Sequence, residues 1–74
     1  MNTDILIVKK QKDVAAGAEA FFNGTTVKVK KSFKVQFGIS LSNYALKNKV
    51  ELWECDMVHR FGYIEYKLKK THKS

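Results

Sequence analysis

The feature that most constrains the fold is an alternation of residue types between Thr25 and Phe37. Apolar or aromatic residues take one parity almost without a break, and polar residues, most of them lysine, take the other. A period of two is typical of a β-strand with one buried and one solvated face. The pattern predicts a strand surface carrying Lys28, Lys30 and Lys34 side by side, which repel one another unless water, salt or an anionic partner screens them.

The centre of this run, residues 30–32, has the length of a hairpin loop. Such a loop places Val29 opposite Phe33 and Val27 opposite Val35, and it keeps the apolar side chains on one face. One continuous strand fits the same alternation but exceeds the usual strand length in so small a domain. We therefore predict a hairpin here.

Two elements are predicted before this hairpin. Four consecutive aliphatic residues, Ile5 to Val8, indicate a strand over residues 4–9 that is buried on both faces at the centre of the sheet. A helix is predicted over residues 13–22, with Asp13 as its cap and Gly24 after its end. Its apolar residues recur at helical spacing: Val14, Ala18 and Phe21.

The second half of the chain predicts another hairpin. From residue 38 to residue 49 the alternation weakens and polar residues such as Ser40, Ser42 and Asn43 recur, which indicates a connection with at most one helical turn. After it, Cys55 and Met57 share one parity, and residues 63–68 alternate cleanly. With residues 59–62 as the loop, Met57 faces Ile64 and Cys55 faces Tyr66.

A helix over residues 42–61 is the alternative for this segment. Leu46, Val50, Trp53 and Met57 also fall at helical spacing. The abundance of β-branched and aromatic residue types favours strands.

The predicted fold class is α+β, with one helix packed on a small, mainly antiparallel sheet of four or five strands. We expect residues 1–68 to form a single compact domain and residues 69–74 a basic mobile tail. A chain of 74 residues buries only about 60% of the surface that its unfolded chain exposes. The stability margin should therefore be thin, and a homodimer is one way to widen it.

Composition argues against several classes of protein. Cys55 is the only cysteine, so no disulfide and no thiolate metal cluster can form within one chain. His59 and His72 lie apart from any ligand set, so no zinc site is expected. No apolar run is long enough for a signal sequence or a membrane span, so we expect a cytoplasmic protein without membrane contact. Since no catalytic motif is present, we expect no enzyme activity, no cofactor and no metal.

Most of the negative charge falls within one short region, at Glu51, Glu54, Asp56 and Glu65. Carboxylates grouped in this way can hold Mg²⁺. No accompanying motif supports such a site. Cross-strand pairing with Lys67 and Lys69 is the favoured interpretation.

The charge balance points to an anionic partner. The formal net charge is +7, from 14 basic and 7 acidic residues, which favours nucleic acid or an acidic protein surface. We predict a nucleic-acid interface at these lysines: Lys28, Lys30, Lys31, Lys34, Lys69 and Lys70. Arg60 is the only arginine, which disfavours base readout and favours binding with little sequence specificity. Phe33 and Phe37 are expected in the core, whereas Tyr44, Phe61 and Tyr63 are candidate exposed rings.

Three alternatives stay open at this point. The chain could be a protein-interaction module or inhibitor, of the kind that phages and mobile elements encode, docking on an acidic surface of a larger complex. A helix-turn-helix over residues 33–50 is disfavoured by the period of two that precedes it. A lysine bias arising from A/T-rich coding DNA would explain the charge without any partner.

Overall fold

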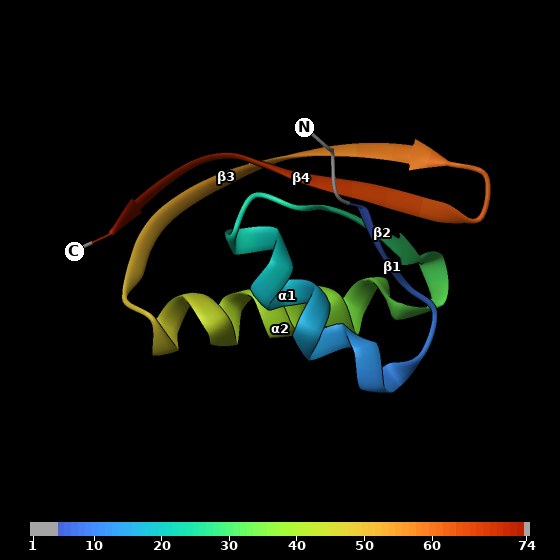
Figure 1. The fold of residues 1–74 in the computed structure, drawn as a ribbon, viewed down its shortest axis with the longest axis horizontal. Coiled ribbons are helices and arrows are strands. Elements are labelled where there is room, and N and C mark those ends of the chain that lie inside the picture. The colour runs from blue at the N-terminus through green and yellow to red at the C-terminus, as the bar shows by residue number, and fades with distance from the viewer. Residues whose placement is uncertain (1–4, 74) are drawn as a thin grey trace.

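The fold of residues 5–73, described here from a computed structural model, consists of two α-helices and a four-stranded sheet (Figure 1). The strands are β1 (Ile5–Val8), β2 (Thr26–Lys30), β3 (Val50–Arg60) and β4 (Tyr63–Lys73). The helices are α1 (Val14–Phe22) and α2 (Lys34–Lys47), and each is preceded by a single 3-10 turn, η1 (Gln11–Asp13) and η2 (Lys31–Phe33). None of the helices in these residues is long and apolar enough to cross a membrane.

The sheet has the strand order β1-β2-β4-β3 and both helices cover the same face of it (Figure 1). The β1–β2 pair is parallel, because α1 carries the chain back between the two strands, and the other two pairs are antiparallel. The α+β class is therefore confirmed. The expected single helix is wrong, since α2 is a second one, and the sheet is mixed.

The prediction that the first strand lies at the sheet centre is wrong. β1 is an edge strand, and its four aliphatic residues divide between the two faces of the sheet. Val8 is fully buried under the helices, whereas Ile5 and Ile7 are 51% and 43% exposed on the uncovered face. A continuous apolar run thus did not mean burial on both faces.

The predicted hairpin over residues 25–37 is also wrong beyond its first strand. Val27 and Val29 are buried as expected, but the strand ends at Lys30 and the chain turns through η2 into α2. Phe37, Leu41 and Ala45 recur every four residues and are buried against α1 and the sheet. Over the length of α2 this helical period prevails over the short alternation at its start.

The helix α2 also replaces the connection predicted over residues 38–49. It runs to Lys47 and is closed by Asn48, whose side-chain amide donates a hydrogen bond to the Tyr44 carbonyl at 2.9 Å. Lys49 then takes a left-handed φ of 57°, which turns the chain into β3. One continuous helix over most of residues 33–50 likewise leaves no helix-turn-helix there.

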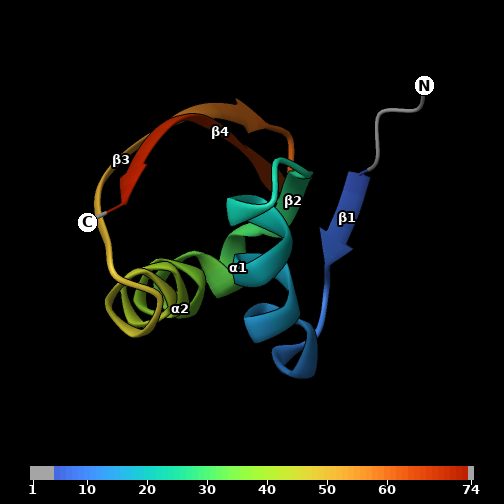
Figure 2. The same cartoon turned by 60° about the vertical axis from the view of Figure 1, so that its left-hand side comes forward.

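The second hairpin is confirmed, and a helix over residues 42–61 is wrong because β3 begins at Val50. Its loop is shorter than predicted, consisting of Phe61 and Gly62, so Met57 faces Tyr66 and Cys55 faces Leu68. This shift of two residues keeps the partners of Met57 and Cys55 at the predicted parity, and a bulge between Glu54 and Cys55 changes the register beyond them. The expected domain boundary at residue 68 falls inside β4, which continues to Lys73 and curves with β3 over the end of α2 (Figure 2).

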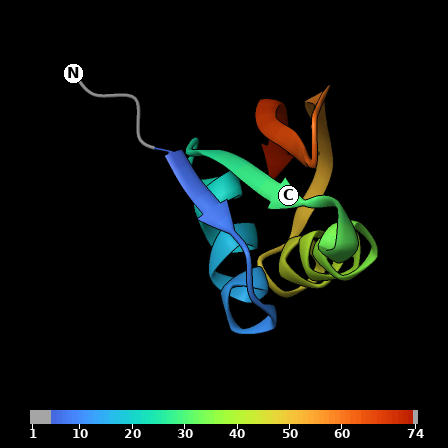
Figure 3. The same ribbon diagram turned by 90° about the vertical axis from the view of Figure 1, so that its right-hand side faces the viewer.

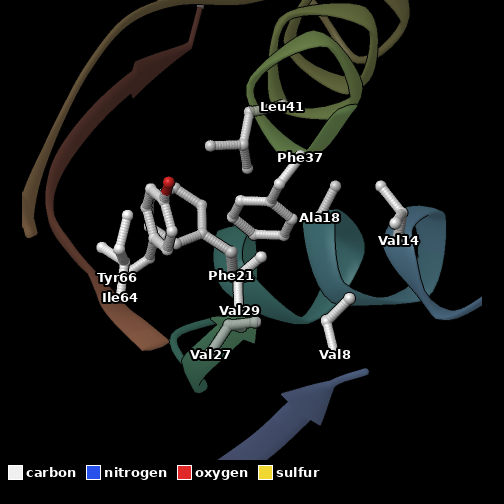
Figure 4. Close-up of a cluster of buried hydrophobic side chains, with 10 residues drawn as sticks. All are labelled: Val8, Val14, Ala18, Phe21, Val27, Val29, Phe37, Leu41, Ile64 and Tyr66. Atoms are coloured by element: carbon white, nitrogen blue, oxygen red, sulfur yellow. The ribbon is translucent and has the colours of Figure 1, made fainter. Parts of the chain in front are cut away.

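The core lies between the two helices and the covered sheet face (Figure 4). The rings of Phe37 and Tyr66 lie 4.7 Å apart, and Phe21 meets Trp53 edge to face at 5.8 Å. Gly17 brings α1 against β1, since a Cβ at this position would lie 2.7 Å from Val8 Cγ2. The buried cluster consists of Val8, Val14, Ala18, Phe21, Val27, Val29, Phe37, Leu41, Ile64 and Tyr66.

Candidate nucleic-acid interface

The connection from β1 to α1 and the connection from β2 to α2 lie at the same end of the molecule. Because β1 and β2 are parallel and Val8 pairs with Val29, the residues that follow both strands emerge at the same edge of the sheet. The turn between β3 and β4 lies at this end as well, since Lys30 pairs with Tyr63. Figure 3 views the molecule from this side, with both connections and the turn toward the reader.

Six lysines lie on these two connections, and each of them is exposed. We call this set the basic end: Lys9, Lys10, Lys12, Lys30, Lys31 and Lys34. Asp13 is the acidic residue within residues 9–13 and 30–34, and it is half-buried at the start of α1. Like charges this close together repel one another in water, so an anion that neutralises them is favoured at this surface.

Hydrogen bonds fix the backbone of the basic end, whereas its lysine side chains are exposed to solvent. The Asp13 N–H donates to the Lys10 carbonyl at 3.0 Å, which closes η1. The Lys31 N–H donates to the Gly62 carbonyl at 3.2 Å, which ties the second connection to the β3–β4 turn. Both helices begin here, so the positive ends of their dipoles add to the lysine charge.

An aromatic ring stands beside these lysines. Phe61 occupies the tip of the β3–β4 turn and is fully exposed, at 101%. Gly62 next to it takes a φ of 79°, which glycine adopts without steric cost. Since the Gly62 carbonyl accepts the hydrogen bond from the Lys31 N–H, the turn that carries Phe61 lies close to the basic end.

The other predicted rings are less available. Tyr44 is half-buried and stacks on Phe22 with ring centroids 5.2 Å apart, and Tyr63 is half-buried on the sheet. Phe37 is fully buried and Phe33 is partly buried against the core, as expected from the alternation. Of the three candidate exposed rings, Phe61 alone is fully open to solvent.

The continuous lysine face predicted on the strand does not form. Lys34 is the first residue of α2, so it lies outside the sheet. Lys28 does lie on the uncovered sheet face, but Glu65 stands opposite it, and that carboxylate accepts a hydrogen bond from Arg60 Nε at 3.0 Å. One carboxylate thus faces two cations here, so the charge around Lys28 is only partly offset. Lys30, Lys31 and Lys34 belong to the basic end.

Lys69 and Lys70 lie apart from the basic end. Lys70 is seven residues along β4 from Tyr63, a distance of at most about 23 Å along the strand. Lys70 also pairs with Glu54 across the hairpin, as Lys67 pairs with Asp56. The structure thus divides the predicted site between two regions.

Sequence reasoning left out half of the basic end. The predicted interface does not include Lys9, Lys10 and Lys12, because their nearness to Lys30 depends on the parallel pairing of β1 with β2. The strand-helix-strand order of residues 4–30 is the signal that could have revealed it. Parallel strands joined by a helix end at the same edge of the sheet, which is where α/β folds place ligands.

The remaining chemically reactive groups offer no second site of this kind. Burial, followed by the charge of Asp56, raises the pKa of the Cys55 thiol, so the thiol is protonated at neutral pH. Burial, followed by Cys55, also raises the pKa of Tyr66. Among residues 5–70, whose side chains the structure describes, no three His, Cys, Asp or Glu side chains gather as a metal ion would require.

Comparison with known proteins gives no match: no family model, no curated protein and no solved structure is similar enough to this chain. A functional assignment therefore rests on the charge and geometry described above.

Proposed function

We propose that this protein is a non-catalytic nucleic-acid-binding protein that contacts phosphates through its basic end. The observation that carries the proposal is the gathering of six exposed lysines on two adjacent connections that hold a single acidic residue. Ammonium groups need only charge and reach to neutralise phosphates, and the released counterions supply the binding free energy.

The residue types at this surface favour binding with little sequence specificity. Base edges are read best by the planar fork of arginine, and Arg60 already donates to Glu65. Lysine acts on phosphate as a point charge without a fixed direction. The protein should therefore bind many sequences with similar affinity.

The exposed ring favours unpaired bases over a duplex. A base that is free of its partner can stack on an aromatic side chain, which contributes about 1–3 kcal/mol per base. Phe61 stands at the tip of a turn beside Lys31, so a strand that runs across the basic end can place one base on its ring. A duplex keeps its bases stacked and gains only the phosphate contacts.

The proposal is tested with two triple variants that reverse lysine charges in different regions of the protein but change its net charge by the same amount. One triple variant replaces Lys10, Lys12 and Lys31 with Glu at the basic end. Its matched control replaces Lys47, Lys69 and Lys70 with Glu, and each substitution in either variant lowers the charge by two units. Fluorescence anisotropy then measures binding of labelled single-stranded and duplex oligonucleotides at one salt concentration.

We expect the basic-end variant to lose at least tenfold in affinity for both oligonucleotides, and the control to lose much less. Phe61→Ser should weaken single-stranded binding selectively. Equal losses in the two triple variants would mean that net charge alone drives binding, which contradicts a defined interface. A larger loss in the control would move the site to the sequence-predicted Lys69 and Lys70.

A further inference from the structure

The helix α2 carries a second apolar face that the core does not use. Val35, Ile39 and Leu46 are 70%, 57% and 80% exposed, although the helix already buries Phe37 and Leu41 on its opposite side. With Ser42, they follow one another at intervals of four, three and four residues. We call Val35, Ile39, Ser42 and Leu46 the α2 stripe.

The spacing of the α2 stripe is that of a helix-packing seam. At 3.6 residues per turn, its four positions lie within about 60° of one another around the helix axis. The alternation of four and three residues is the repeat with which one helix meets another. A solvent-facing helix surface is normally polar, so three large aliphatic side chains in this register indicate a surface made for contact.

A groove adjoins the α2 stripe. It has a volume of about 230 Å³ and lies between α1 and α2. Asn43, which lines it, is one helical turn from Ile39 of the stripe. Small residues leave room in it for an apolar side chain of a partner; the lining consists of Ala15, Ala18, Ser40, Asn43, Tyr44 and Lys47.

The charges on α2 and on the turns that flank it all have one sign. Residues 31–49, which span η2, α2 and the following turn, include four lysines and no acidic residue. Lys34 and Lys47 are exposed at the two ends of α2. A partner helix with acidic flanks would place carboxylates near Lys34 and Lys47 while its apolar residues cover the stripe.

Self-association is a poorer explanation of the same surface. A second copy would bring its own lysines against these and add another +7 of net charge. The stripe alone, about 17 Å long and 10 Å wide, is also far smaller than the roughly 800 Å² that each partner of a stable dimer contributes. We propose that the α2 stripe and the adjoining groove dock an acidic amphipathic helix of a partner protein.

The test uses two synthetic helical peptides of about 18 residues. Both carry leucines at the spacing of the stripe, and one has glutamate at its flanking positions where the other has lysine. Anisotropy of the labelled peptides measures binding to the full chain and to two double variants. One variant is Ile39→Ser with Leu46→Ser, and its control, Ile5→Ser with Ile7→Ser, removes exposed aliphatic residues from the sheet.

We expect the acidic peptide to bind, the lysine peptide not to bind, and the stripe variant to lose at least tenfold in affinity while the sheet variant does not. Nucleic-acid binding should be unchanged in the stripe variant, so the outcome is independent of the proposed function. Equal binding of both peptides, or of neither, would overturn the proposal. The proposal would also be overturned if sedimentation equilibrium showed a dimer of the wild-type chain and a monomer of the stripe variant. Binding to anionic vesicles that depends on the stripe, without binding of either peptide, would overturn it as well.

Discussion

At the scale of single residues, the effect of a Gly→Ala substitution on stability depends on the atoms that surround the added methyl group, as one glycine in each helix shows. Gly17 of α1 faces the core, where a Cβ would lie 2.7 Å from Val8 Cγ2 and 3.1 Å from Phe37 Cε1. Gly38 of α2 has no atom within 4 Å of the same position. Neither glycine has a positive φ, so both backbones accept alanine.

We expect Gly17→Ala to destabilise the protein by about 1–2 kcal/mol, because the cost of overpacking exceeds the gain in helix propensity. Gly38→Ala should stabilise it by about 0.5–1 kcal/mol through propensity alone. Urea unfolding followed by Trp53 fluorescence measures both changes. A stabilising Gly17→Ala would contradict the close contact of α1 with β1.

At the scale of elements, Trp53 is the aromatic contact of the β3–β4 hairpin with the end of α1, in a region where Cys55 and Leu68 also pack against the core. Trp53 of β3 meets Phe21 at 5.8 Å and Phe22 at 5.3 Å, both edge to face, where α1 ends. Phe22 in turn stacks on Tyr44 of α2. This aromatic group joins both helices to the long hairpin.

Trp53→Ala should therefore destabilise the protein by about 3 kcal/mol, the lower end for such a truncation, since the ring is only partly buried. In this domain that loss is large enough to shift thermal unfolding strongly, which circular dichroism measures. Leu52→Ala is the control in the same strand, because Leu52 is 68% exposed and should cost little. Equal effects of the two substitutions would contradict the attachment through Trp53.

The elements that the sequence predicts well are those whose residues all obey one period. The alternation of residues 63–68 and the helical spacing of Val14, Ala18 and Phe21 gave β4 and α1. The start of α2 was misread because Phe33, Val35 and Phe37 alternate as in a strand. Val35 nonetheless faces solvent, and only the longer run through Leu41 and Ala45 reveals the helix.

The hairpin register shows a different limit. Met57 and Cys55 have partners of the predicted parity because the register there is shifted by two residues. The partner of each residue depends on the length of the loop and on the bulge between Glu54 and Cys55. The predicted loop over residues 59–62 would place Asp56 opposite Glu65, a pair of like charges, whereas the two-residue turn at Phe61 and Gly62 places Asp56 opposite Lys67.

At the scale of the whole molecule, the distribution of charge was only partly predictable. Lys30, Lys31 and Lys34 are neighbours in the sequence, so their grouping followed from local spacing. Lys9, Lys10 and Lys12 join them only through the parallel pairing of β1 with β2, a contact between distant parts of the chain. Conversely, Lys69 and Lys70 were grouped with the others by charge alone, and β4 carries them away along the sheet.

The central claim, that the basic end neutralises phosphates, is tested most directly by the salt dependence of binding to single-stranded DNA. If all six lysines of the basic end contact phosphates, the logarithm of the association constant should fall with the logarithm of salt concentration with a slope of about −4. The variant with glutamate at positions 10, 12 and 31 should have a slope of half that size or less. A wild-type slope near zero, or no binding at low salt, would contradict the claim.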